Sequence, residues 1–453
     1  MIPLRVTPDP GARRIGNLIL GGSPYVVLRL SAKAVSRVDA WLAGEPVAPD
    51  DAKLADLLVR KGILHPKREI TSLTAQDVTV VVPVRDHADD LARLLPALSE
   101  VAKVLVIDDG SAEPIRAATV RHHKAKGPAA ARNAGWRLAG TELVAFLDAD
   151  VRPEPGWLAT ILPHFEDPSV VAVAPRVAST PGPSVLDRYE ELRSPLDLGA
   201  AEAPVRPGSR VSYVPSAALV VRFNALLEHD GFDEDMRFGE DVDLVWRFHE
   251  AGAQIRYEPT AIVHHRPRET WSAWVRQRFG YGTSAAPLAL RHGRAVAPVK
   301  ISMWSALAWA LVAAGRPVLA GAVAGTTASL LPRKLSDVGV PATESVQLAV
   351  RGHVGAGRLL GDAVVRSWWP VAIPVLASTR WGRWVLLAAF ARHVEEWYTR
   401  GAKVGLPGWL AARILDDLAY GAGVWWGAVK HRTVRPLLPD LSDWPGRDGV
   451  GRT

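Results

Sequence analysis

The sequence contains no cysteine, and only three of its 453 residues are methionine. A chain without thiols has no disulfide, no zinc–thiolate site and no cysteine nucleophile, so those classes of chemistry are excluded. Its first 20 residues carry Arg5, Arg13 and Arg14 without a long apolar core after them. We therefore expect no secretory signal peptide.

The excess of positive charge is small for this length. Lys and Arg number 54 against 47 Asp and Glu, which gives a net charge of +7. Such an excess favours anionic partners such as nucleotide phosphates or lipid headgroups, and surface solubility accounts for it equally well. We expect no nucleic-acid partner. The length predicts two or three domains.

Three zones of the sequence differ in composition and hydrophobic pattern, and we place their boundaries at residues 1–72, 75–290 and 291–453. The first zone has a strand-like run, Tyr25 to Leu30, and Ser31 can cap a helix that continues to Ala43. A second helical stretch, Ala52 to Lys61, precedes Gly62-Ile63-Leu64. This zone is predicted to be a small α+β module.

The second zone alternates buried-type strands with helical stretches, as expected for an α/β sheet. Strands this uniformly apolar indicate a sheet that is covered on both faces. No G-x-G-x-x-G follows the first strand, which argues against a dinucleotide-binding site. The predicted strands are Val78–Val84, Val104–Ile107, Leu143–Leu147, Val170–Ala174 and Ala218–Phe223.

Carboxylates follow two of these strands. Asp108-Asp109 ends the second strand, and Asp148-Ala149-Asp150 ends the third. Ligands of open α/β sheets bind beyond the carboxyl ends of the strands, so Asp109 can accept hydrogen bonds from a nucleoside. Asp148 and Asp150 can share a hard divalent cation such as Mg²⁺ or Mn²⁺. The alternative is that these residues are ordinary turn and loop acids.

Small residues between the two acidic pairs start a helix, Gly127–Gly135, that can pack closely on the sheet. Lys126 and Arg132 can face phosphate at this helix start, or can be solvated charges beside a packed helix. A later helix begins near Asp241, where acids are also favoured by the helix dipole. As a general base, Asp241 would deprotonate an acceptor hydroxyl. His264 ends a short apolar strand and can complete the shell of a manganese ion.

Together these residues resemble family 2 glycosyltransferases of the GT-A fold. The resemblance covers Val78 to Tyr281 and rests on five ordered motifs, VVVPVRD, IDDGS, GPAAARNAG, FLDADV and GEDVDLVWR. It implies a nucleotide-sugar-binding mixed sheet flanked by helices, and an inverting, metal-dependent transferase with Asp241 and Glu240 at the catalytic centre. The implied metal ligands are Asp148, Asp150 and His264. The implied donor-binding residues are Pro83, Val84, Asp86, Asp109, Lys126, Arg132, Asp148, Ala149, Arg276 and Arg278.

The chain departs from the family's processive polysaccharide synthases, which carry Q-x-x-R-W after the base. The corresponding stretch here runs from Trp274 to Gly282 and lacks that motif. This departure argues against a processive channel, although Arg276 and Arg278 can still approach the donor diphosphate.

The first 70 residues resemble PqqD-type winged-helix modules, which recognise peptide precursors of modified natural products, often by strand addition. A module of this type before a family 2 transferase implies transfer of glucose from UDP-glucose to the hydroxyl of a small, peptide-derived redox cofactor precursor. Three alternatives remain: a cell-envelope lipid or polysaccharide acceptor, a scaffold protein on a GT-A fold, and a sugar nucleotidyltransferase. The last normally has a glycine-rich loop after the first strand, and Pro83-Val84-Arg85 provides none.

The third zone is predicted to be helical and contains 11 of the 17 tryptophans. Its uncharged stretches Ile301–Gly315 and Pro317–Pro332 are 15 and 16 residues long, short of the about 20 that a membrane span requires. Tryptophan and arginine at the ends of short apolar stretches are typical of helices at a membrane interface. We therefore expect this zone to lie on an anionic membrane surface at the cytoplasmic face, or else to pack on the transferase core in the cytoplasm.

Overall fold

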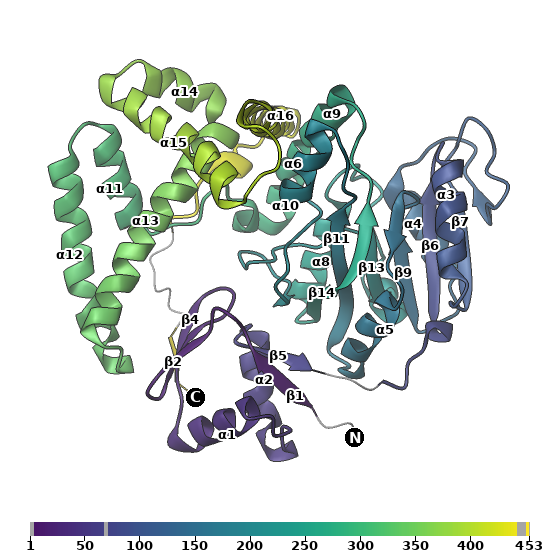
Figure 1. The fold of residues 1–453 in the computed structure, drawn as a ribbon, viewed down its shortest axis with the longest axis horizontal. Helices are drawn as coiled ribbons and strands as arrows, with labels where there is room; N and C mark the ends of the chain where they lie inside the picture. The colour runs from purple at the N-terminus through teal and green to yellow at the C-terminus, as the bar shows by residue number, and fades with distance from the viewer. Residues whose placement is uncertain (1–3, 68–70, 442–449, 453) are drawn as a thin grey trace.

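A computed structural model describes residues 4–67, 71–441 and 450–452. A central α/β sheet, a small N-terminal module and a C-terminal set of helices are arranged around one another, with the module below the other two parts in Figure 1.

The central sheet has nine strands and is mixed. Its order is β10-β14-β11-β13-β9-β6-β7-β8, and β12 pairs with β14. Strands β6, β7, β8 and β9 are parallel, whereas β13 runs antiparallel between β9 and β11. The strands are β6 (Val78–Val84), β7 (Lys103–Asp108), β8 (Val120–Arg121), β9 (Leu143–Leu147), β10 (Val151–Pro153), β11 (Val170–Ser179), β12 (Ala203–Pro204), β13 (Ala218–Arg222) and β14 (Gln254–His265).

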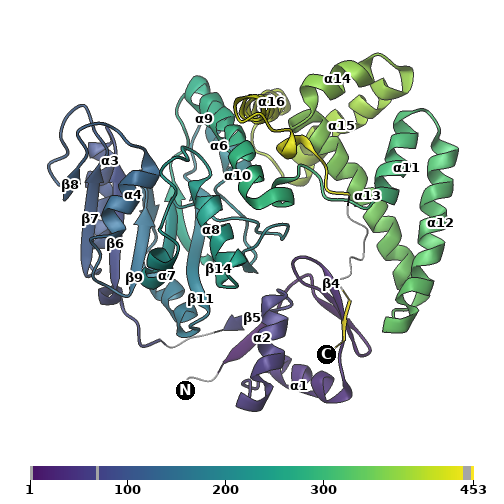
Figure 2. The same ribbon diagram turned by 180° about the vertical axis from the view of Figure 1, so that it is seen from behind.

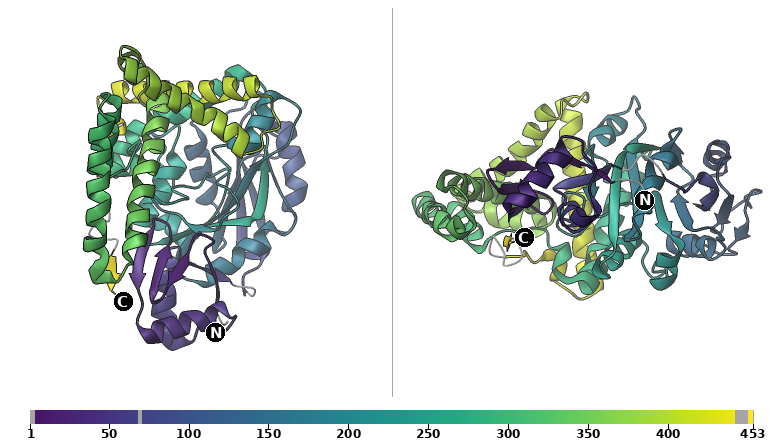
Figure 3. Two further views of the ribbon diagram at one scale, coloured as in Figure 1. Left: turned by 60° about the vertical axis from the view of Figure 1, so that its left-hand side comes forward. Right: turned by 90° about the horizontal axis from the view of Figure 1, so that it is seen from below.

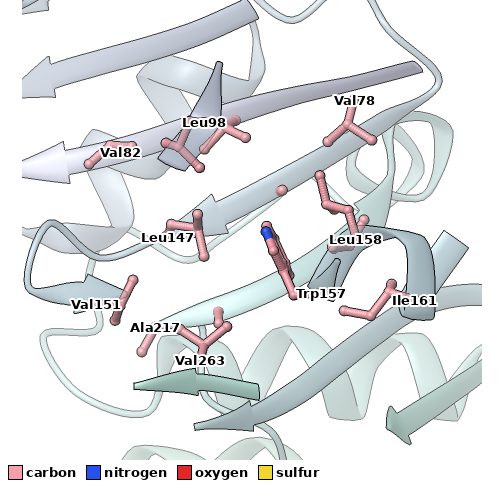
Figure 4. Packing of buried hydrophobic residues seen from close by; sticks show 14 of the residues in the cluster. Val78, Val82, Leu98, Leu147, Val151, Trp157, Leu158, Ile161, Ala217 and Val263 are labelled. Carbon is pink, nitrogen blue, oxygen red and sulfur yellow. The ribbon is translucent and has the colours of Figure 1, made fainter. Parts of the chain in front are cut away.

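Both faces of this sheet are covered, as the apolar runs predicted. Successive side chains of β6 point to opposite faces, so Val80 and Val82 join one core and Val81 joins the other. The first core is closed by α3 (Ala88–Leu94) and α5 (Trp157–Ile161), whose Trp157 packs over the strands (Figure 4). The second is closed by α4 (Pro128–Trp136), α7 (Phe223–Glu228) and α8 (Glu240–Glu250), seen in Figure 2.

The small residues of α4 allow the close packing that the sequence predicted. A Cβ at Gly135 would lie 2.3 Å from Val81 Cγ1, so the helix can approach β6 only with glycine there. The five predicted strands are confirmed, but three of them have different ends. Strand β7 is one residue longer at each end, β11 continues to Ser179, and β13 is one residue shorter. Arg222 ends β13, and Phe223 already begins α7.

The N-terminal part has its own apolar core, built from two helices and short strands. Ser31 caps α1 as expected, because its Oγ accepts a hydrogen bond from Ala34 N at 3.2 Å. The elements are β1 (Arg5–Pro8), β2 (Arg13–Ile15), β3 (Leu18–Gly21), β4 (Val26–Arg29), α1 (Ala32–Leu42), α2 (Ala52–Arg60) and β5 (Leu64–Lys67). The C-terminal strand β15 (Val450–Arg452) pairs with β4 in parallel.

A loop of the central α/β part attaches to this module. The guanidinium of Arg206 donates to the carbonyl oxygen of Ser23, and Arg210 N donates to Ser23 Oγ at 2.6 Å. The Arg210 side chain also pairs with Asp9. The loop between β12 and β13 is therefore fixed to the module by several polar contacts.

The C-terminal zone is helical, as predicted. Its long helix α16 crosses α9 at very short range. A Cβ at Gly282 of α9 would lie 2.0 Å from the carbonyl oxygen of Tyr420 in α16, so this approach depends on the glycine. The left view of Figure 3 shows α11 to α13 rising beside the sheet. Helices α9 (Trp271–Thr283) and α10 (Ala285–His292) end the second zone. The helices of the third are α11 (Met303–Ala313), α12 (Pro317–Leu335), α13 (Ala342–Arg366), α14 (Trp369–Ala377), α15 (Arg380–Thr399) and α16 (Leu406–Lys430).

The remaining α-helix is α6 (Val185–Arg193), and short 3₁₀ turns connect several elements. These turns are η1 (Pro49–Asp51), η2 (Ala75–Asp77), η3 (Leu95–Leu98), η4 (Leu162–Glu166), η5 (Gly293–Val296), η6 (Ser336–Val338) and η7 (Arg435–Leu437).

In the part of the chain that the structure describes, no single helix has the length and apolar character to cross a membrane. Helices α13 and α14 together meet that criterion by length and composition, across a bend of 104°.

Candidate functional site

A cavity of about 1420 Å³ opens at the carboxyl ends of the central strands. The end of β6 and the residues that follow β7 and β9 form its sheet side. The start of α8 and helices α9, α10 and α16 also line it. Ligands of open α/β sheets bind at this end of the strands. The cavity is therefore the candidate active site.

Asp109 lies on the sheet side and is buried. Its carboxylate accepts hydrogen bonds from His122 Nδ1 at 2.8 Å, Lys126 N at 2.8 Å and Gly127 N at 2.9 Å. The loop before α4 is thus folded around Asp109. Lys126 contributes its backbone to this arrangement, while its side chain is exposed and does not line the cavity. The expectation that Lys126 faces a phosphate in the cavity is not met by this structure.

The D-x-D pair follows β9 as predicted. Asp148 lines the cavity, and its Oδ1 accepts from Arg132 Nη2 at 2.7 Å. Asp150 is largely buried, with Oδ2 3.5 Å from His265 Nε2 and 3.7 Å from Arg268 Nη1. Burial raises the pKa of Asp150, but the hydrogen bond and charge of His265 together with Arg268 outweigh it and lower that pKa to about 2. Asp150 is therefore ionised at any physiological pH.

The structure selects His265, not His264, as the histidine beside this pair. Neighbouring residues of β14 point to opposite faces, and His265 faces Asp150 and the cavity. His264 points away and lies 2.7 Å from Glu154 Oε1 through its Nε2. His264, the metal ligand implied by the sequence, therefore does not face this pair.

The expectation that Arg132 faces a phosphate is not met. Arg132 is 4% exposed, and its Nη1 donates to Glu240 Oε1 at 2.8 Å while Nη2 binds Asp148. Helix α4 therefore supplies a buried cation that links the start of α8 to the D-x-D pair. A buried arginine with two carboxylate partners has its charge compensated within the protein.

Glu240 and Asp241 open α8 and both line the cavity. The half-buried Asp241 accepts from Ser216 N at 3.0 Å and from Val242 N at 2.8 Å. Burial raises the pKa of Glu240 to about 7, to which the charge of Asp241 also contributes. Burial likewise raises the pKa of Asp241, opposed by the Ser216 amide and by Arg132. Asp241 is therefore a stronger base than an exposed aspartate.

The other predicted donor residues divide into two groups. Pro83, Val84, Arg276 and Arg278 line the cavity, whereas Asp86 and Ala149 do not. The Asp86 carboxylate accepts from Ala112 N at 2.7 Å, and Ala149 is buried in the apolar core. These two residues shape the loops around the site.

Arg276 and Arg278 differ although both line the cavity. Arg276 is exposed, and the described chain shows no hydrogen bond or ion pair for it. Arg278 is 2% exposed and pairs with Glu190 and Asp416, which join α9 to α6 and α16. The structure assigns Arg278 to an internal ion pair, and leaves Arg276 available to a ligand.

Several cavity residues were not predicted from the sequence. Ser216 orients Asp241 through its backbone, which no side-chain motif can indicate. Phe238 belongs to the same motif as the base, RFGEDVD, and its ring also lines the cavity. The sequence also gave no reason to select Arg268, Tyr213 or Tyr281, which reach the cavity from other elements.

One further histidine–carboxylate trio lies outside this cavity. The ligand atoms of His164, Glu202 and Glu258 all come within 4.8 Å of one another. His164 Nε2 lies 3.0 Å from Glu258 Oε2, and Glu202 pairs with Arg256. Because these groups already compensate one another's charge, we assign no metal to them.

Residues 79–226 match the family model described as Glycosyl transferase family 2. A pre-mycofactocin glycosyltransferase of Mycobacterium tuberculosis (strain ATCC 25618 / H37Rv) is 42% identical over 450 residues, covering 94% of this chain and 95% of that protein. The succinoglycan biosynthesis protein ExoU of Rhizobium meliloti (strain 1021) is 31% identical over 219 residues, covering 43% and 62%. Among solved structures, the mannosyltransferase PcManGT from Pyrobaculum calidifontis, in complex with GDP-Man and Mn²⁺, aligns with a TM-score of 0.40 at 17% identity, covering 79% and 87%.

Proposed function

Because the chain belongs to the pre-mycofactocin glycosyltransferases, within glycosyl transferase family 2, we propose that it glucosylates a peptide-derived redox cofactor precursor of the mycofactocin type. The donor is UDP-glucose and the acceptor group is a hydroxyl. One observation carries the proposal: a single cavity holds both the D-x-D residue Asp148 and the half-buried carboxylate of Asp241.

The donor side fits a divalent cation. Asp150 is ionised, His265 lies beside it, and one carboxylate oxygen of Asp148 has no hydrogen-bond partner in the described chain. Oxygen ligands with one imidazole suit Mn²⁺, and Mg²⁺ accepts the carboxylates. When bound, the ion would neutralise the negative charge that develops on the departing UDP.

Asp241 is the proposed general base. The amides of Ser216 and Val242 hold its carboxylate in one orientation, and its raised pKa favours proton removal from an acceptor hydroxyl. The acceptor oxygen forms a bond to the anomeric carbon as the bond to UDP breaks, and Asp241 takes the proton. One displacement of this kind inverts the anomeric configuration.

We propose that residues 1–72 help to recognise the acceptor. Arg210 supports this role because it lines the cavity and also pairs with Asp9 of the module. The loop that carries Arg210 continues to Ser216, which orients Asp241. An acceptor held by the module would thus lie on the same side of the cavity as the base.

Incubation with UDP-glucose, Mn²⁺ and a pre-mycofactocin-type acceptor tests the proposal. We expect the acceptor mass to increase by one hexose residue, with a β-linked product from the α-linked donor. Chelation of the metal should stop transfer. If neither UDP-glucose nor another nucleotide sugar yields a hexose shift on any hydroxyl acceptor, the proposed activity is wrong.

We also propose that the C-terminal helices bind the surface of an anionic membrane at the cytoplasmic face. Many large apolar side chains on α11 to α15 are exposed, among them Val318 at 83%, Val375 at 60% and Trp384 at 59%. An exposed apolar surface of this extent on a monomer indicates an interaction site.

The charge of the same helices supports a lipid partner. Residues 303–403 contain eleven Lys and Arg against five Asp and Glu, which accounts for six of the seven excess positive charges of the chain. Apolar side chains with flanking cations match the chemistry of an anionic lipid interface. A membrane location also favours the second candidate function, transfer to a cell-envelope lipid or polysaccharide.

Vesicle sedimentation tests this location. The protein should sediment with vesicles that contain phosphatidylglycerol, and binding should weaken with added salt because exposed charges are screened. Trp384→Glu combined with Val375→Glu should abolish sedimentation and leave soluble-acceptor transfer intact. Leu227→Glu, at an exposed apolar position on α7, is the matched control and should bind as the parent does. Equal partition of all three proteins would contradict the proposal.

A further inference from the structure

The segment 205–217 joins β12 to β13 and contacts both the N-terminal module and the proposed catalytic centre. It begins in a tight turn, in which Arg206 N donates to the carbonyl oxygen of Val211 at 3.2 Å. Its later residues form part of the cavity wall, and they are Ser212, Tyr213, Pro215, Ser216 and Ala217. The segment therefore connects the contact between two parts of the chain with the candidate active site.

The catalytic end of this segment contacts both the proposed base and the D-x-D pair. Ser216 N donates to Asp241 Oδ2 at 3.0 Å. The carbonyl oxygen of Ala217 accepts from Asp148 N at 3.0 Å. Ser216 is 1% exposed, so water has little access to replace its amide as a donor. A displacement of this end would therefore change the hydrogen bonding of the Asp241 carboxylate.

The other end of the segment is fixed to the module. Arg206 Nε donates to the carbonyl oxygen of Ser23 at 2.8 Å, and Arg210 N donates to Ser23 Oγ at 2.6 Å. The guanidinium of Arg210 donates to Asp9 Oδ2. The Asp9 side chain is only 4% exposed, so protein groups rather than water compensate its charge.

A buried histidine orients the Asp9 carboxylate. His65 Nδ1 lies 3.1 Å from Arg256 Nη2, and because an arginine can only donate, Nδ1 is the acceptor. Burial lowers the pKa of His65, which is therefore neutral near pH 7 and has its proton on Nε2. This N–H donates to Asp9 Oδ2 at 3.0 Å. Asp9 is thus held from β14 through His65, and the oxygen that accepts from His65 also accepts from Arg210.

Contacts along the segment connect its two ends. Val211 is fully buried, and the carbonyl oxygen of Ser212 accepts from Trp246 Nε1 at 2.7 Å. Trp246 belongs to α8, the helix that begins with the proposed base. A segment packed in this way moves as a unit, because voids and unpaired buried polar groups are costly. A shift at the module end is therefore carried to Ser216.

We propose that Asp9 of the N-terminal module is a positioning residue for sugar transfer: by fixing Arg210, it holds the segment so that the Ser216 amide orients Asp241. The inference rests on the proposed function, and it gives the module a part in catalysis besides acceptor recognition. Asp9 is not among the residues that line the cavity, so its effect passes through the segment.

Asp9→Asn tests this role. Asp9 Oδ1 accepts from Gly11 N, and Oδ2 accepts from His65 and Arg210, so an asparagine must turn its NH₂ group toward a donor. We expect kcat for transfer to fall by about 10- to 100-fold, because a misplacement of about 1 Å can cost about 100-fold. The acceptor KM and the UDP affinity should stay within about twofold, since no binding group is removed.

Asp39→Asn is the matched control, because Asp39 forms an exposed ion pair with Arg14 on the same module. This variant should equal the parent in kcat and in KM. Ser23→Ala is a second test of the proposal, and it decides the matter if Asp9→Asn does not fold. It removes the acceptor of Arg210 N and should lower kcat in the same direction, by a smaller factor.

The pH profile of kcat/KM separates positioning from a loss of folded enzyme. Burial raises the pKa of Asp241, and the hydrogen bond from the Ser216 amide opposes this. Without that bond the pKa rises further, so the acid limb of the profile should move to higher pH in Asp9→Asn. A smaller folded fraction would lower the rate equally at every pH. The other groups that act on Asp241 are unchanged by the substitution, and they are Arg132, Asp148, Tyr213, Glu240 and Tyr281.

Hydrogen–deuterium exchange follows the segment without any turnover. Amides of residues 205–217 should exchange faster in Asp9→Asn than in the parent protein or in Asp39→Asn. Three results overturn the inference: an unchanged kcat, a lower kcat with an unmoved pH profile, and a higher acceptor KM at the parent kcat. If the parent protein transfers no sugar, the proposed function fails, and the exchange rates still decide whether Asp9 fixes the segment.

Discussion

Asp241→Asn is expected to lower kcat for glucosyl transfer by about 10²–10⁴-fold, the range that a positioned general base contributes. Asparagine has the same shape and can still accept the Ser216 amide hydrogen bond, but it cannot remove a proton. The affinity for UDP should stay within about twofold, because Asp241 is neither a metal ligand nor a nucleotide ligand in the proposed site. Steady-state kinetics with mass detection of the product, together with calorimetric titration of UDP, separate these two effects.

The pH dependence of the unfolding temperature, Tm, checks that Asp241→Asn folds as the parent does. Burial and the charge of Asp241 raise the pKa of Glu240 to about 7, above its unfolded value near 4.3. A raised pKa means that the stability present at low pH is lost as pH rises through 7. Asn at position 241 removes part of this repulsion, so the Tm at pH 8 should equal or exceed that of the parent.

Glu240→Gln is the matched comparison for Asp241→Asn. Glu240 is buried and bound to Arg132, so this change should weaken the positioning of α8 without removing the base. Its kcat should fall less than that of Asp241→Asn. If Asp241→Asn retains turnover and Glu240→Gln loses it, the two roles are exchanged.

His265→Ala is expected to weaken Mn²⁺ binding at least about tenfold, the lower end of the losses seen when groups that support a metal site are removed. His264→Ala should leave Mn²⁺ affinity unchanged, because His264 faces Glu154 on the other side of β14. Water-proton relaxation, titrated with Mn²⁺ in the presence of UDP, measures this affinity without any turnover. Asp150→Ala should abolish the relaxation change, since it removes an ionised oxygen ligand.

Two controls make the metal prediction specific. Each histidine variant should keep its thermal unfolding transition within a few degrees of the parent, so that a change in Mn²⁺ binding is not a loss of fold. A double variant of His164→Ala and Glu258→Gln, in the other histidine–carboxylate cluster, should bind Mn²⁺ as the parent does. Loss of binding in His264→Ala, with His265→Ala unaffected, would restore the ligand set expected from the sequence.

Arg132 connects the two sites of the mechanism. Its side chain contacts both Asp148 of the D-x-D pair and Glu240 beside the base. Ion pairs this deeply buried hold their partners in defined positions, because leaving either carboxylate unpaired is costly. Arg132 of α4 therefore holds the D-x-D pair and the start of α8 in fixed positions relative to each other.

The sequence by itself determined the sheet and the chemistry of its edge. Apolar runs such as Val78–Val84 allow no solvated face, so they require cover on both sides, and acids after β7 and β9 must meet at one edge because both strands are parallel to β6. The same logic placed Asp109 and Asp148 at one site, whereas Asp241, at a helix start, was joined to them by the family resemblance. Family resemblance then supplied the reaction, which local physical rules cannot supply.

Only the tertiary structure decided which histidine faces the cavity. Between Glu258 and Ile262, β14 contains three residues more than the stretch of β11 that it pairs with. The side chains after this irregularity therefore point to the faces opposite to those that a simple alternation along β14 predicts. Likewise, an arginine at a helix start can bind a phosphate or a protein carboxylate. The choice at Arg132 depends on Glu240, 108 residues away in sequence, and only packing brings the two together. Sequence fixes which groups are available, and long-range packing fixes which of them face one another.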